Sequence, residues 1–134
     1  MLTMVIDDSR AMRLILKRIV AQLGFDVVEA GNGKEAMDYL TKAMEGGEDA
    51  ALPGLALVDC NMPEMNGLEF VIAVRAEPRL RNMTLMMVTT ESEQSQIVRA
   101  LASGAHEYVI KPFTPDAIID KLQLLGLIPN GVAA

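Results

Sequence analysis

Residues 54–59 read Gly54-Leu55-Ala56-Leu57-Val58-Asp59, an apolar run of strand length that ends in an acidic residue. Polar residues do not alternate with apolar ones in this run, which is typical of a parallel strand covered on both faces. On both sides of it, apolar residues recur three and four positions apart, which indicates amphipathic helices. We therefore predict a buried strand of an α/β protein at this position.

The same alternation of strand and helix extends outward from this segment along the whole chain. The predicted strands are 2–6, 26–30, 54–59, 84–89 and 108–110. Five β-α units in a chain of 134 residues imply a parallel sheet with helices on both faces. The expected fold is a flavodoxin-like (βα)5 doubly wound sheet with strand order 2-1-3-4-5 in three α/β/α layers. We expect one domain at residues 1–126 and a short C-terminal tail at 127–134.

Local signals mark where the helices begin and end. Ser9 can cap the first helix, and Gly24 is placed to end it. Pro78 disfavours helical geometry in the residue before it and so ends the third helix. Thr114 supplies a capping hydroxyl for the last helix, and Pro115 occupies its first helical position.

Apolar residues at helical spacing predict the faces that the helices bury. The first helix carries them at Met12, Ile15, Leu16, Ile19, Val20 and Leu23. The third helix carries them at Leu68, Val71 and Ile72, and the fourth is expected to face inward with Ile97, Val98, Leu101 and Ala105. An apolar fraction of 51% is ample for one continuous core.

Composition excludes several classes of function. A net charge of −6 and an aromatic fraction of 4% without Trp argue against a nucleic-acid-binding surface, which needs clustered cations and stacking rings. Apolar runs are too short to span a bilayer, and the N-terminus lacks the features of a secretory signal, so no membrane insertion is expected. The single cysteine, Cys60, has no partner for an internal disulfide, which agrees with a cytoplasmic protein.

Chemically active side chains stand at the ends of four predicted strands: Asp7-Asp8, Asp59, Thr89 and Lys111. Taken singly, each could be an ordinary strand-ending or turn residue. In open α/β sheets, however, the carboxyl ends of the strands meet at one edge, where sites form. Three carboxylates there would raise each other's pKa unless they shared a cation. A hard divalent ion such as Mg²⁺ suits oxygen ligands, with Mn²⁺ as the alternative.

A metal ion, an ammonium and a hydroxyl together form an anion-binding set. Lys111 would neutralise phosphoryl oxygens, and Thr89 would donate a hydrogen bond to one of them. Asp59 is the best candidate for a nucleophile, since carboxylates can form aspartyl-phosphate intermediates. The sequence thus indicates phosphoryl transfer onto Asp59.

The motifs in this order resemble the response-regulator receiver family, above all its stand-alone chemotaxis-type (CheY-like) members. The matching residues are Asp7-Asp8, Asp59, Met62-Pro63, Gly67, Val88-Thr89-Thr90-Glu91 and Lys111-Pro112-Phe113. The resemblance runs from Leu2 to about Leu125. It implies a two-component phosphorelay in which a sensor histidine kinase or a histidine phosphotransfer protein donates the phosphoryl group.

The resemblance also implies a role for each site residue. Asp59 would be the phosphoacceptor and, with Asp8, a direct ligand of Mg²⁺. Asp7 would bind the metal through a water, and the backbone carbonyl of Asn61 would complete the protein ligands. Lys111 would pair with the phosphoryl group. The chain would catalyse only its own phosphorylation and dephosphorylation and would not be an enzyme in the ordinary sense.

Signal output is expected from a two-state surface. Thr89 and Tyr108 resemble the family's coupled switch pair, in which movement of Thr89 makes room for the Tyr108 ring. The fourth helix, fifth strand and fifth helix would report the change to an effector protein. A flagellar motor switch or another chemotaxis component is one candidate effector. The resemblance further implies a cis peptide bond between Lys111 and Pro112.

Three residues are expected to tune dephosphorylation. Asn61 and Glu91 match fast self-dephosphorylating receivers, since they could orient an attacking water. Thr90 is bulkier than the Ala or Gly common at its position, so we expect it to slow the water's approach. Of the other candidates, His106 lies on the opposite side from the site, so the donor histidine must belong to another protein. Cys60 is expected to be a small packed side chain, with a redox-sensitive thiol left open.

Three rival functions are weaker. A haloacid-dehalogenase-like phosphatase usually carries a second Asp two positions after its nucleophile, where this chain has Asn61. A phosphorylation-independent adaptor tends to lose one of the site residues, and here all are present. Flavodoxin-like cofactor binding needs a phosphate loop after the first strand, but residues 7–10 read Asp-Asp-Ser-Arg.

Overall fold

The computed structural model describes residues 1–47 and 51–129, apart from the side chain of Glu91. The strands are β1 Leu2–Ile6, β2 Asp26–Ala30, β3 Leu55–Val58, β4 Thr84–Thr90 and β5 Glu107–Lys111. The helices are α1 Arg10–Gln22, α2 Gly33–Met44, α3 Gly67–Ala76, α4 Gln94–Ser103 and α5 Pro115–Leu124, with short 3-10 turns at Pro78–Leu80 and Glu91–Glu93. The five predicted strands and five predicted helices are therefore present, and no strand end differs from its predicted position by more than one residue.

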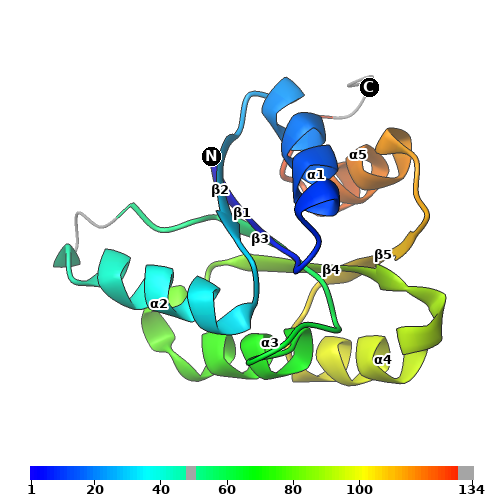
Figure 1. Cartoon of the computed structure of the whole chain (residues 1–134). Helices are drawn as coiled ribbons and strands as arrows, with labels where there is room; N and C mark the ends of the chain where they lie inside the picture. Colours follow the sequence, from blue (N-terminus) through cyan, green and yellow to red (C-terminus); the bar gives the residue numbers. More distant parts are fainter. Residues whose placement is uncertain (48–50, 130–134) are drawn as a thin grey trace.

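The five strands form one parallel sheet in the order β2-β1-β3-β4-β5. Helices α1 and α5 cover one face of this sheet, and α2, α3 and α4 cover the other (Figure 1). The predicted three-layer flavodoxin-like fold is confirmed. Because all strands run the same way, the ends of β1, β3, β4 and β5 lie along one edge.

Successive residues of a strand point to opposite faces of the sheet, so the strands contribute side chains to two hydrophobic cores, one on each face. In β1, Met4 and Ile6 pack with α2, α3 and α4, whereas Val5 packs with α1 and α5. Every residue of β3 is buried, as expected for a central strand covered on both faces. This burial fixes the register of β1 and β3, and with it the positions of the acids that follow them.

Side-chain caps begin the helices where the sequence predicts them. The Ser9 hydroxyl accepts the backbone N–H of Met12, and the Thr114 hydroxyl accepts that of Ala117. Helix α3 adds a feature absent from the prediction, a capping box in which Asn66 and Glu69 each accept the other's backbone N–H. This box fixes the start of α3 just after the loop that follows Asp59.

Three of the apolar positions predicted to face the core are exposed instead. Val98, predicted to face inward from α4, is 65% exposed, and Ala100 is buried in its place. Ile15 and Ile72, on the predicted stripes of α1 and α3, are also exposed. The apolar stripe of a helix covers only about 100° of its surface, so residues at its margin need not be buried. Apolar character alone could not show which margin faces the sheet.

Candidate functional site

Three carboxylates gather at the carboxyl edge of the sheet. Asp7 and Asp8 directly follow β1, and Asp59 directly follows β3. One oxygen from each lies within 4.8 Å of the others. Asp7 and Asp59 are buried, whereas Asp8 is exposed. The predicted acidic cluster therefore forms, with one member open to solvent.

Asp7 is held rigidly by its neighbours. Its Oδ1 accepts the backbone N–H of Ser9 at 2.8 Å, and its Oδ2 accepts Lys111 Nζ at 2.8 Å. Arg13 Nη1 donates to its backbone carbonyl at 2.6 Å. The contact of Arg13 with Asp7 could not be predicted from the sequence, because nothing in the helical spacing distinguishes Arg13 from an ordinary surface arginine.

Lys111 comes from the end of β5 and joins the two buried acids. Its Nζ lies 2.8 Å from Asp7 Oδ2 and 3.7 Å from Asp59 Oδ1. Three carboxylates and one ammonium leave a net charge of −2 when all are ionised. The Lys111–Pro112 peptide bond is cis. One lysine cannot balance the site, so a further cation would be attracted to it.

The ionisation of Asp59 reflects this imbalance. Burial raises the pKa of the Asp59 carboxyl above its ordinary value, the Lys111 ammonium lowers it, and the Asp7 carboxylate raises it again. A divalent cation among the carboxylates would favour the ionised form of Asp59. The charge state needed for nucleophilic attack is thus the one that a metal would stabilise.

The donor set fits a hard divalent ion. Asp7, Asp8 and Asp59 offer carboxylate oxygens from two strand ends, and exposed Asp8 leaves one side open to water ligands. Such oxygen-rich, partly hydrated sites suit Mg²⁺. Asn61 lies in the exposed loop two residues after Asp59, and the metal-ligand role of its carbonyl stays a prediction.

Thr89 provides a buried hydroxyl beside the cluster. It lies near the end of β4, is 1% exposed, and is close enough to Asp59 to lower the pKa of that carboxyl. Its Oγ1 nevertheless has no hydrogen-bond partner of ordinary geometry among the described residues. Leaving a buried hydroxyl unpaired costs about 1–3 kcal/mol. An oxygen delivered to the site would remove that cost.

A glycine allows the loop after Asp59 to fold tightly. Gly67 donates its N–H to the Cys60 carbonyl at 3.0 Å, and a Cβ here would lie 2.9 Å from Cys60 Cα. Besides the end of the Met87 side chain, the nearest atoms are the Asp59 carbonyl oxygen and Cys60 Cα, and these backbone atoms cannot move as the end of a side chain can. Gly67 therefore allows α3 to begin in direct contact with the backbone of Asp59 and Cys60.

Thr90 and Glu91, two of the residues expected to tune dephosphorylation, follow Thr89 directly at the end of β4. Thr90 ends β4, is exposed, and forms a 2.9 Å hydrogen bond between its hydroxyl and that of Ser92. Glu91 begins the following 3-10 turn, but its side chain lies outside the described residues. Tyr108, in β5, is 38% exposed and therefore points outward.

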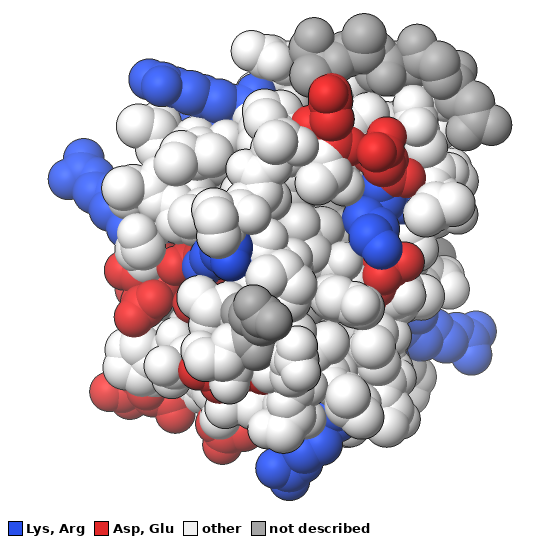
Figure 2. Space-filling view, turned by 90° about the vertical axis from the view of Figure 1, so that its right-hand side faces the viewer, with Lys and Arg blue, Asp and Glu red and all other residues white. Residues whose placement is uncertain are grey.

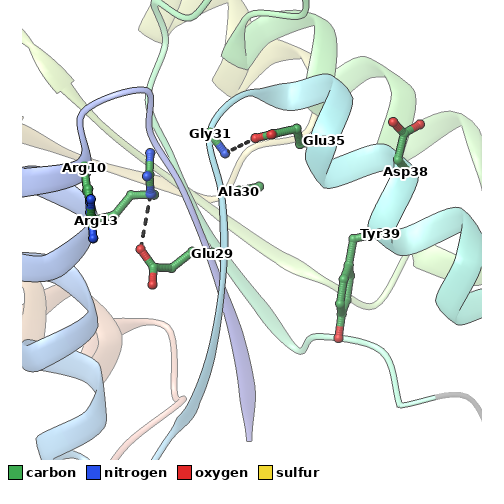
Figure 3. A pocket seen from close by; sticks show the side chains of 8 residues that line it. All are labelled: Arg10, Arg13, Glu29, Ala30, Gly31, Glu35, Asp38 and Tyr39. Carbon is green, nitrogen blue, oxygen red and sulfur yellow. Dashed lines mark hydrogen bonds and ion pairs between the residues drawn. The ribbon is translucent and has the colours of Figure 1, made fainter.

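A separate cleft of about 670 Å³ lies beside the carboxylates, between α1, β2 and α2. Figure 3 shows two arginines on the α1 wall, and two acids and a tyrosine on the α2 wall. The Arg13 side chain pairs with Glu29 at 3.2 Å in this cleft while also contacting Asp7. Because Asp7, Asp8 and Asp59 do not line it, the cleft is a neighbour of the candidate site and not its centre.

The two remaining candidate groups take structural positions. Cys60 is fully buried, and burial raises the pKa of its thiol to about 11, so the reactive thiolate is suppressed. His106 lies just before β5, at the opposite end of the sheet from Lys111. Its Nδ1 accepts the backbone N–H of Leu85 at 3.1 Å. Neither group takes part in the acidic site.

The surface charge agrees with the composition. On the face that Figure 2 shows, lysine and arginine side chains are scattered and form no continuous basic patch. Within residues 1–47 and 51–129, no helix is both long enough and apolar enough to cross a bilayer.

Comparison with known proteins identifies the class to which this fold and site belong. The family model of the response regulator receiver domain matches residues 3–123, which is nearly the whole chain. The chain therefore belongs to the response regulator receiver family. Proteins of this family act in signalling and are not classical enzymes.

Individual relatives narrow the class to receiver domains of the CheY type. A chemotaxis protein CheY homolog of Campylobacter jejuni is 46% identical over 121 residues, covering 90% of this chain and 88% of the relative. Chemotaxis protein CheY1 of Helicobacter pylori is 39% identical, covering 91% and 94%. The structure of the chemotaxis response regulator CheY4 of Vibrio cholerae superposes with a TM-score of 0.79 at 30% identity, covering 92% and 97%.

Proposed function

We propose that this chain is a single-domain response regulator that accepts a phosphoryl group from phosphohistidine onto Asp59. The donor would be a sensor histidine kinase or a histidine phosphotransfer protein, and the receiver domain would span residues 1–126, with 127–134 as its tail. The observation that carries the proposal is the meeting of three carboxylates and the Lys111 ammonium at one sheet edge. The unpaired Thr89 hydroxyl beside them supports it.

The proposed step transfers a phosphoryl group between two proteins. A carboxylate oxygen of Asp59 attacks phosphorus, a new O–P bond forms, and the N–P bond to the donor histidine breaks with its electron pair going to the imidazole. Lys111, already 3.7 Å from Asp59, would stabilise the added negative charge. Thr89 would donate its free hydroxyl to a phosphoryl oxygen.

Asp8, Asp59 and the carbonyl of Asn61 would hold Mg²⁺, or Mn²⁺ in its place, directly, and Asp7 would hold it through a water. The bound ion would supply charge neutralisation at the phosphoryl oxygens. The rigid hydrogen bonds on both oxygens of Asp7 would keep this group oriented without reorganisation during transfer. The protein would return to the resting state when a water attacks phospho-Asp59. Asn61 and Glu91 would orient this water, and Thr90 would hinder its approach.

Output would depend on the switch pair and one surface. Phosphorylation adds a charge of roughly −1.5 to −2 and three acceptor oxygens. Movement of Thr89 toward those oxygens would make room for Tyr108, and the surface of α4, β5 and α5 would then bind an effector. The relatives are chemotaxis proteins by name, which supports a chemotaxis component as that effector. We further propose a flagellar motor switch as one such component and the cytoplasm as the place of action.

Intact-mass measurement tests the proposal. The wild-type protein, incubated with Mg²⁺ and acetyl phosphate, should gain one phosphoryl group, and Asp59→Asn should gain none. Omission of Mg²⁺, or chelation by EDTA, should abolish the gain. Absence of any modification would favour the phosphorylation-independent adaptor, and sustained hydrolysis of a phosphoester substrate would favour the phosphatase.

A further inference from the structure

A cation from α5 lies over the ring of Tyr108. Lys121 Nζ is 5.3 Å from the ring centroid, within the range at which an ammonium is attracted to the face of an aromatic ring. Tyr108 belongs to β5, an edge strand of the sheet, and is 38% exposed. The outward position of the ring is therefore accompanied by a specific attractive contact.

Glu107 fixes the lysine in that place. Its Oε1 lies 3.2 Å from Lys121 Nζ and also accepts the backbone N–H of Tyr108 at 2.9 Å. The Lys121 side chain is only 32% exposed, so it does not sample solvent freely. Lys121 of α5 thus contacts both the Glu107 carboxylate and the Tyr108 ring of β5.

Tyr108 also borders an apolar groove between α4 and β5. The groove has a volume of about 420 Å³ and is lined by Gln94, Ile97, Val98, Leu101, Tyr108 and Ile110. Val109 packs with the core under α5, whereas Ile110 packs with the core under α4. By strand alternation Tyr108 shares the α4 side with Ile110, so its ring can turn from the lysine toward an apolar surface.

We propose that Lys121 is a positioning residue that holds Tyr108 outward and so sets how much unphosphorylated protein adopts the signalling conformation. This inference rests on the proposed function, in which an inward Tyr108 marks the active state. Turning the ring inward would separate it from the ammonium. Loss of an exposed cation–π contact should favour the inward position by roughly two- to fivefold.

Fluorine NMR can read the ring position directly. The chain has two tyrosines, so 3-fluorotyrosine in a Tyr39→Phe background leaves Tyr108 as the single probe. Spectra would be recorded with Mg²⁺ alone and with Mg²⁺ and acetyl phosphate. The variants are Lys121→Gln, which removes the cation, and Lys121→Arg, which keeps it. Lys42→Gln is the matched control, since Lys42 is exposed and has no ion pair among the described residues.

In the resting state, Lys121→Gln should move the fluorine signal part of the way toward its phosphorylated position, whereas Lys121→Arg and Lys42→Gln should not. An unshifted Lys121→Gln, in a protein whose signal still moves on phosphorylation, would overturn the role of Lys121 and leave the proposed function intact. A signal that does not move on phosphorylation, even though intact mass shows the phosphoryl group, would overturn the switch itself.

Discussion

Lys111 Nζ lies closer to Asp7 Oδ2, at 2.8 Å, than to Asp59 Oδ1, at 3.7 Å. The ammonium therefore occupies the acidic cluster in the described state and partly balances the charge that would attract a metal. A bound metal would compete with this lysine for the same carboxylates, although both are needed for the proposed phosphoryl transfer.

This competition predicts tighter metal binding when the lysine is removed. Lys111→Ala leaves all three carboxylates without a cation, so the dissociation constant for Mg²⁺ should fall roughly three- to tenfold, given the strength of charge interactions at partly buried sites. Isothermal titration calorimetry at constant ionic strength measures it. Lys42→Ala should bind as the wild type does, and weaker binding by Lys111→Ala would show that the ammonium organises the ligands instead of competing for them.

Backbone crowding predicts a cost for Gly67→Ala. The added Cβ would meet backbone of the Asp59–Cys60 segment, which must shift. We expect a loss of about 1–3 kcal/mol in the free energy of unfolding, the usual range for overpacking. Urea denaturation followed by circular dichroism measures the loss. Gly54→Ala is the control, since Gly54 likewise has no positive φ and its Cβ would meet only the flexible Met1 side chain, and an equal loss in both variants would refute the crowding argument.

Thr90 should lengthen the lifetime of phospho-Asp59, because its side chain crowds the path of the attacking water. Thr90→Ala removes both the methyl group and the hydrogen bond to Ser92, whereas Thr90→Ser keeps the hydroxyl and removes only the methyl group. Hydrolysis of phospho-Asp59 should be several-fold faster in Thr90→Ala, since the barrier is steric. Phosphoryl loss followed by mass spectrometry measures the rate, and an unchanged or longer lifetime would reject the hypothesis.

We expect the folded protein to lose stability in mild acid because of His106. Burial lowers the pKa of His106 below its ordinary value, and the nearby Arg75 guanidinium lowers it further. The unfolded chain therefore binds a proton more readily than the folded one, so this contribution to stability is complete above about pH 6.5 and declines as pH falls toward the folded-state pKa. Its Nδ1 accepts the Leu85 N–H and must stay unprotonated to do so.

Denaturation at several pH values tests this assignment. His106→Asn supplies an acceptor oxygen that does not titrate, so its free energy of unfolding should fall less between pH 7.5 and pH 5.5 than that of the wild type. Identical pH profiles for the two proteins would contradict it.

The fold followed from the sequence because strand burial and helix caps are local signals. The apolar run that ends at Asp59 predicted a buried strand, and Ser9 and Thr114 predicted caps that the structure contains. Exposure of Val98 could not be predicted, since it depends on the rotation of α4 against the sheet.

The residues that form the candidate site could also be predicted, but the contacts between their side chains could not. Parallel strands necessarily bring Asp7, Asp59 and Lys111 to one edge. Which carboxylate the ammonium contacts more closely depends on side-chain conformations, which residue spacing does not determine. The same applies to Lys121 above Tyr108, because the two residues belong to different elements and nothing in the sequence links them.

The central claim is that Asp59 is the phosphoacceptor, and borohydride trapping tests it most directly. Borohydride reduces an aspartyl phosphate to homoserine, which peptide mass spectrometry can locate. After treatment with acetyl phosphate and Mg²⁺, we expect homoserine at position 59 and unmodified aspartate at Asp7 and Asp8. Homoserine at either of those positions, or its absence from a protein shown to carry phosphate, would contradict it.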